Sequence, residues 1–135
     1  HTNEDIGIVL GQAIKKALGD KKGIKRFGSS SVPMEEVVAN VVIDISGRPT
    51  YTLLCDKPNS VVKSSDGYAL KDAGHFFEGL AKQLGMNINI KISPVSSDLH
   101  TTLEPVFKAL GVALDQATQV DPRRKGIPST KGIID

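Results

Sequence analysis

The sequence predicts an α+β fold in which a sheet is backed by helices. Segments with the apolar spacing of a helix are interspersed with segments rich in Val and Ile, one of which shows strict two-residue alternation. The predicted order is helix, strand, strand, helix, strand, helix, without the regular βαβα alternation of parallel α/β folds. A single layer of strands packed against helices is therefore expected.

Composition limits the classes of function. The 135 residues are 39% hydrophobic and 24% charged, which is typical of one soluble globular domain. No apolar run approaches the length of a membrane span, so a membrane partner is not expected. A net charge of +2, an aromatic content of 4% and the lack of Trp argue against nucleic acid as a partner. The single cysteine, Cys55, cannot form an internal disulfide, and it fits a reducing compartment, which is the cytoplasm or, for a plant protein, a plastid.

The first predicted element is a helix over residues 4–18, followed by Gly19 and a basic turn. This leading helix has no strands of its own, so it is expected to be the end of a unit that begins outside this sequence. Its apolar face would then need cover from another chain, which predicts self-association. The residues of that face are Ile6, Val9, Leu10, Ala13 and Ala17.

A β-hairpin is predicted next, with residues 35–45 pairing with residues 50–55 across Ser46–Pro49. A helix over 69–84 ends at Gly85. Residues 86–93 alternate with period two, which predicts a strand with Met86, Ile88, Ile90 and Ile92 on one face.

The last predicted helix begins at Thr101 or Thr102 and ends near Ala117. Thr101 and Glu104 match a capping box, and Pro105 is expected in the first turn, where its missing N–H costs little. This start leaves His100 outside the helix, so a helical His100–Glu104 pair cannot be assumed.

Two kinds of candidate site residues stand out. His1 with Glu4 and His100 with Glu104 combine imidazole and carboxylate at short spacing, which suits Mn, Fe or Zn, although solvated helix faces show the same spacing. Basic residues lie in separate loops, and the stretch "PSTKG" could cradle an anion or could be a mobile polar tail. His75, beside two phenylalanines, is by itself more typical of a partly buried histidine than of a ligand.

Several strings occur together in one order along nearly the whole chain: "HTNEDIGIVLGQAIKKALGDKKGIKRFG", "VVIDISGRP", "HFFEGLA", "LEPVFKALGVAL" and "DPRRKGIPSTKG". With these strings the chain closely resembles the imidazoleglycerol-phosphate dehydratases, manganese-dependent lyases of histidine biosynthesis. The resemblance implies a tandem of half-domains like domain 2 of ribosomal protein S5. Residues 1–27 would be the terminal helix and turn of a first half-domain, and residues 28–135 a complete second half-domain with a phosphate-binding tail.

The resemblance also implies a site. The implied Mn2+ ligands are His1, Glu4, His75, His100 and Glu104, and Glu4 and Glu104 are also the implied catalytic carboxylates. The implied contacts to the substrate phosphate are Arg26, Arg48, Lys108, Ser129, Thr130 and Lys131. The resemblance further implies a phosphorylated imidazole substrate and a homo-oligomer whose sites lie between subunits.

One departure concerns the second metal motif, where Thr101 stands in the place of a histidine. Two functions therefore remain open. The first is a hydro-lyase that dehydrates imidazole glycerol phosphate to imidazole acetol phosphate, with activity impaired by this change. The alternative is a non-catalytic fragment or diverged paralogue that keeps the fold and an anion-binding loop.

Overall fold

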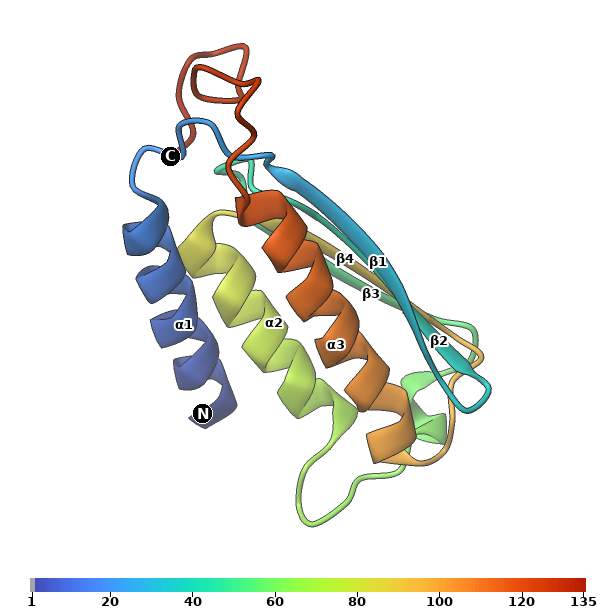
Figure 1. Cartoon of the computed structure of the whole chain (residues 1–135). Coiled ribbons are helices and arrows are strands. Elements are labelled where there is room, and N and C mark those ends of the chain that lie inside the picture. The colour runs from blue at the N-terminus through green and yellow to red at the C-terminus, as the bar shows by residue number, and fades with distance from the viewer. Residues whose placement is uncertain (1) are drawn as a thin grey trace.

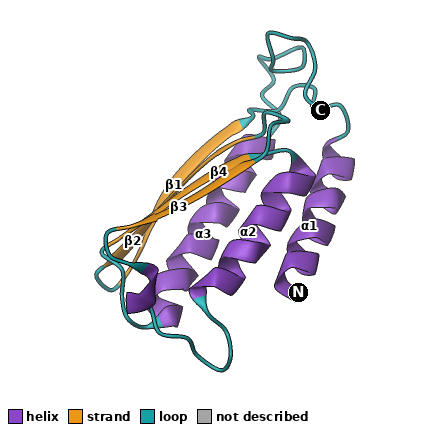
Figure 2. Ribbon diagram, turned by 180° about the vertical axis from the view of Figure 1, so that it is seen from behind, coloured by secondary structure: helices purple, strands orange, loops and turns teal. Residues whose placement is uncertain are grey.

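The computed structural model describes residues 2–135, and it confirms the predicted α+β class. A four-stranded sheet is covered by helices on one side, as Figures 1 and 2 show. None of the helices in the described part of the chain is long and apolar enough to cross a membrane. The elements in chain order are α1 (Thr2–Leu18), β1 (Phe27–Met34), β2 (Val37–Asp44), β3 (Thr50–Cys55), the 3-10 turn η1 (Asn59–Val61), α2 (Leu70–Leu84), β4 (Asn87–Ser93) and α3 (Leu99–Thr118).

The strand order is β1-β2-β4-β3, so the predicted hairpin is wrong. β2 forms its hairpin with β1 across Glu35 and Glu36, and β3 pairs in parallel with β4 at the far edge of the sheet. β1 was missed because its sequence, "FGSSSVPM", is short of apolar residues and contains Pro33. Pro33 lacks a backbone donor, and β1 is an edge strand, where this is tolerated.

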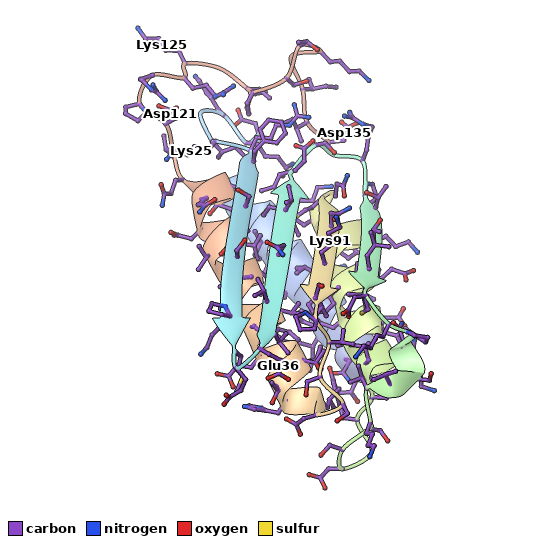
Figure 3. The ribbon with its side chains drawn as sticks, turned by 90° about the vertical axis from the view of Figure 1, so that its right-hand side faces the viewer. Lys25, Glu36, Lys91, Asp121, Lys125 and Asp135 are labelled. Atoms are coloured by element: carbon purple, nitrogen blue, oxygen red, sulfur yellow. The ribbon has the colours of Figure 1, made fainter. Side chains whose placement is uncertain are left out.

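The core lies between the sheet and the helices α2 and α3. The prediction for the third strand is confirmed, because Met86, Ile88, Ile90 and Ile92 are all buried on the helix-facing side. The other face of the sheet is open to solvent among the described residues, and Lys91 of β4 lies on it (Figure 3).

Helix α1 packs on α2 and lies away from the sheet (Figure 1). Its buried positions are the glycines Gly7 and Gly11, not its large apolar residues. A Cβ at Gly7 would lie 2.4 Å from the Phe76 carbonyl oxygen, so only glycine permits this close helix contact. Ile6, Val9 and Leu10 stay 52%, 63% and 40% exposed, which leaves the apolar face of α1 uncovered in a single chain.

Helix α3 begins earlier than predicted. Asp98 is the N-cap, and its carboxylate accepts hydrogen bonds from the Thr101 amide at 3.0 Å and the Thr101 hydroxyl at 2.7 Å. The predicted capping box is therefore wrong, and Pro105 lies inside the helix instead of in its first turn. This shift places His100 within the helix, on the same face as Glu104.

Tyr51 of β3 packs beside Phe77 of α2, and its environment predicts an alkaline weakness. Burial, and then the nearby Cys55 and Glu78, raise the pKa of Tyr51 to about 12. The unfolded chain ionises this phenol near pH 10, so folding stability is present below pH 10 and falls as the pH rises toward 12. We expect Tyr51→Phe to retain about 2 kcal/mol that the wild type loses in this window, measured by urea unfolding at pH 9 and pH 11.5. Equal losses in both proteins would contradict this.

Candidate functional site

The candidate site residues form two groups at opposite ends of the molecule. The helices α1, α2 and α3 all start at one end, and this end carries Glu4, His75, His100 and Glu104 (Figure 1). At the other end, the α1–β1 loop, the β2–β3 loop and the C-terminal tail lie together. Figure 3 shows Lys25, Asp121, Lys125 and Asp135 around this second end. We refer to these as the His/Glu end and the basic end.

At the His/Glu end, Glu104 lies between two basic side chains. His100 Nε2 is 2.5 Å from one carboxylate oxygen, and Lys108 Nζ is 2.7 Å from the other. The Lys108 hydrogen bond is the largest cause that holds the pKa of Glu104 below its usual value. The lowered pKa makes the Glu104 carboxylate a weaker base, which suits a metal ligand better than a proton acceptor.

Glu4 and His75 line a second pocket at the same end, between α1 and α2. The pocket has a volume of about 80 Å³, and Glu78 is also part of its wall. His75 is exposed, so the interpretation as a partly buried histidine does not apply. The predicted ligand His1 lies outside the described residues.

These residues fit Mn2+ in kind but supply few ligands per chain. Imidazole and carboxylate are suitable Mn2+ donors, and both pairs offer one of each. Within residues 2–135, however, no group of three or more His, Cys, Asp or Glu side chains is arranged to hold a metal. A complete octahedral site would need donors in addition to these pairs.

At the basic end, the tail is anchored to the α1–β1 loop, which contradicts the mobile-tail interpretation. Lys21 is 1% exposed, and its Nζ donates to the carbonyl oxygens of Ile134 at 3.3 Å and Asp135 at 3.4 Å. Burial is the main cause that lowers the pKa of Lys21. Gly23 N donates to Gly126 O at 3.0 Å, and Arg26 Nη1 donates to Pro128 O at 2.8 Å.

This anchoring forms a polar pocket of about 360 Å³ at the basic end. Of the predicted phosphate contacts, the structure brings Arg26, Ser129 and Thr130 together in its wall, with Arg124 beside them. Lys131 follows directly, and its amide donates to Ser129 Oγ at 3.1 Å. Arg48 lies in the β2–β3 loop next to Gly47, at which a Cβ would lie 2.9 Å from the Asp135 amide.

Lys108 is the one predicted phosphate contact that the chain places elsewhere. It pairs with Glu104 at the His/Glu end. Lys108 lies halfway along α3, and His100 lies 18 residues, about 27 Å, before the end of this helix at Thr118. One small substrate cannot contact both ends of the same chain.

Comparison with known proteins identifies the family. The family described as "Imidazoleglycerol-phosphate dehydratase" matches residues 1–114. The protein of that name from Bacillus subtilis is 52% identical over 134 residues, which cover 99% of this chain and 67% of the relative. The chain belongs to the imidazoleglycerol-phosphate dehydratase family. The resemblance drawn from the sequence is thereby confirmed.

Further relatives and solved structures agree with this assignment. The imidazoleglycerol-phosphate dehydratase of Geobacter metallireducens is 48% identical over the same share of both chains. The crystal structure of the Pyrococcus furiosus protein matches with a TM-score of 0.82 and 36% identity, covering 98% of this chain and 70% of that one. The Staphylococcus aureus dehydratase matches with a TM-score of 0.80 and 30% identity, covering 90% and 68%.

Three residues of this dehydratase-family chain did not emerge as site residues from the sequence. Arg124 lines the pocket at the basic end, Lys21 holds the tail, and Asp44 pairs with Arg26. Arg124 could have been found from its place in the "DPRRK" cluster beside "PSTKG". Lys21 and Asp44 act through contacts between segments about a hundred and about twenty residues apart, for which sequence spacing gives no signal.

Proposed function

We propose that this chain works as part of a manganese-dependent imidazoleglycerol-phosphate dehydratase in the cytoplasm. The reaction removes water from imidazole glycerol phosphate and yields imidazole acetol phosphate, a hydro-lyase step of histidine biosynthesis. Membership of the dehydratase family carries this proposal. The two chemically distinct ends support it, because one supplies imidazole and carboxylate donors and the other a basic anion pocket.

In such a reaction, different residues of the described chain would bind the metal and transfer the proton. His100 and Glu104 would hold one Mn2+, and His75 would contribute to another, with Glu4 beside it in the same pocket. Bound Mn2+ supplies Lewis-acid chemistry to the imidazole part of the substrate. Glu104, held ionised by Lys108 and His100, acts as a ligand. Glu4 is exposed and lacks such a cationic partner among the described residues, so we assign proton transfer to it.

At the basic end, Ser129, Thr130 and Lys131 with Arg26 and Arg48 would bind the phosphate. Arginine N–H groups and a lysine ammonium form charge-assisted hydrogen bonds with phosphate oxygens, and these fix the substrate orientation. Since His100 lies about 27 Å along α3 from the basic end, we propose that one copy binds the phosphate and another holds the imidazole. The uncovered apolar face of α1 supports such self-association.

The alternative of a non-catalytic scaffold rests on Thr101, which provides a hydroxyl where the family motif has an imidazole. The comparisons do not favour it, because the relatives that cover 99% of this chain are named as dehydratases.

Metal content tests the proposal. We expect the wild-type chain, dialysed against Mn2+ and then against metal-free buffer, to retain the metal and to form a larger assembly in light scattering. Glu104→Gln removes an ionised ligand, so it should lose at least about half of the bound Mn2+. Glu36→Gln, in the β1–β2 turn, removes a carboxylate from the same end of the molecule as Glu104 but outside the candidate ligands, so as the control it should retain the metal (Figure 3). A wild-type chain that stays metal-free, with an assembly that ignores Mn2+, would contradict the proposal.

A further inference from the structure

Asp44, at the end of β2, does not line the pocket at the basic end, but it forms an ion pair with Arg26, which does. Arg26 lies at the end of the α1–β1 loop, and its guanidinium is held on two sides. Nε donates to Asp44 Oδ1 at 2.6 Å and Nη2 donates to Asp44 Oδ2 at 3.2 Å, a bidentate pair. On the other side, Nη1 donates to the carbonyl oxygen of Pro128 at 2.8 Å. The guanidinium thus connects the end of β2 with the tail.

This arrangement leaves Arg26 with spare donors. A guanidinium has five N–H groups, and the three hydrogen bonds above use three of them. The remaining two are available at the pocket that Arg26 lines. Phe27 packs against the guanidinium at 5.0 Å from its ring centroid, which further limits rotation of the side chain.

The backbone of Arg26 is fixed as well, so the pair with Asp44 decides mainly where the side chain lies. Arg26 N donates to Ala117 O at 2.8 Å, and Ile45 N donates to Arg26 O at 3.0 Å. The side chains of Arg26 and Asp44 are only 16% and 26% exposed, so solvent screens this pair less than an open surface pair.

We propose that Asp44 is a positioning residue of the phosphate pocket. It holds the Arg26 guanidinium in one orientation. In this orientation Nη1 binds the carbonyl oxygen of Pro128 and so positions the Ser129–Lys131 segment that follows, while the spare N–H groups face the anion. This inference rests on the proposed phosphate-binding role of the basic end. It assigns to Asp44, a carboxylate that itself would repel phosphate, a role in binding phosphate.

The sign of the effect of Asp44→Asn makes the proposal testable. Removing a negative charge near an anion pocket by itself favours anion binding. Loss of the bidentate pair instead lets the guanidinium and the tail move, which disfavours it. We expect Asp44→Asn to weaken binding of inorganic phosphate by roughly fivefold or more, measured by equilibrium dialysis of the full chain at fixed ionic strength.

Two further variants define the cause. Asp20→Asn removes the same charge from the same end of the molecule, and within residues 2–135 the Asp20 carboxylate accepts a hydrogen bond only from Lys22 N, two residues along the chain. Its phosphate affinity should stay within about twofold of the wild type. Arg26→Lys keeps the charge but cannot form the fork. If Asp44 acts through Arg26, adding Asp44→Asn to Arg26→Lys should no longer weaken phosphate binding.

Hydrogen exchange separates this inference from the proposed function. Asp44→Asn should speed exchange in a peptide covering residues 126–132 and leave the amides of β2 and β4 protected. Phosphate affinity that is unchanged or higher in Asp44→Asn would overturn the positioning role, as would unchanged exchange of the tail. A wild-type chain that binds no phosphate would contradict the proposed function of the pocket, and exchange alone would then decide whether Asp44 positions the tail.

Discussion

Replacing Gly28 with alanine is expected to lower the free energy of unfolding by about 3 kcal/mol or more. Gly28 lies in β1, where α3 crosses the strand closely. A Cβ there would lie 2.0 Å from the carbonyl oxygen of Ala113 and 2.8 Å from its carbonyl carbon. Both are backbone atoms of the helix, so no side chain can rotate away, and β1 and α3 must separate. Urea unfolding followed by circular dichroism measures the loss.

The control for this prediction is a glycine of α3, the helix that approaches Gly28. Gly111 of α3 has no atom within 4 Å of an added Cβ. Gly111→Ala should therefore stabilise the chain by about 0.5 to 1 kcal/mol, because alanine favours the helix more than glycine does. A Gly28→Ala chain as stable as the wild type would show that β1 and α3 do not approach as closely as the structure places them.

Thr101→His is expected to tighten Mn2+ binding by about tenfold or more. Position 101 is one turn before Glu104 on α3, so an imidazole there lies on the same helix face as that carboxylate. The capping of α3 should survive, because Asp98 also accepts a hydrogen bond from the Thr101 backbone amide. Titration of free Mn2+ by electron paramagnetic resonance measures the affinity.

An imidazole elsewhere on α3 controls for simple surface binding. Val112 is 46% exposed and lies two turns beyond Glu104, outside both candidate groups. Val112→His should leave the Mn2+ affinity unchanged. If Thr101→His binds Mn2+ no more tightly than Val112→His does, position 101 is not part of a metal site.

Local sequence signals predicted the elements well and their pairing poorly. The alternation of Ile88, Ile90 and Ile92 and the helix end at Gly85 depend on neighbouring residues, and the structure confirms both. The hairpin prediction failed because strands joined by a short polar segment usually pair with each other. Here β3 instead pairs with β4, which follows it in the chain after α2. Nothing local in "FGSSSVPM" indicates that it forms β1.

The site was predictable in its residue types and less so in its contacts. Helical spacing made His100 and Glu104 candidates, but the start of α3 had to be known before they could be paired. Asp98 decided that start, because its carboxylate caps the helix three residues earlier than the Thr101–Glu104 pattern suggested. Lys21 shows the opposite case. A lysine in a basic turn looks solvated, and only the folded tail shows that it is buried.

The contacts of Lys21 and Arg26 with the tail also bear on when anion binding can begin. They join residues 113 and 102 positions apart, so the chain must be synthesised and folded as far as residue 134 before these contacts exist. A nascent or partly collapsed chain has no such receptor. An anion that occupies it therefore acts as a ligand of the native state alone, and mass action shifts the folding equilibrium toward completion as the anion concentration rises.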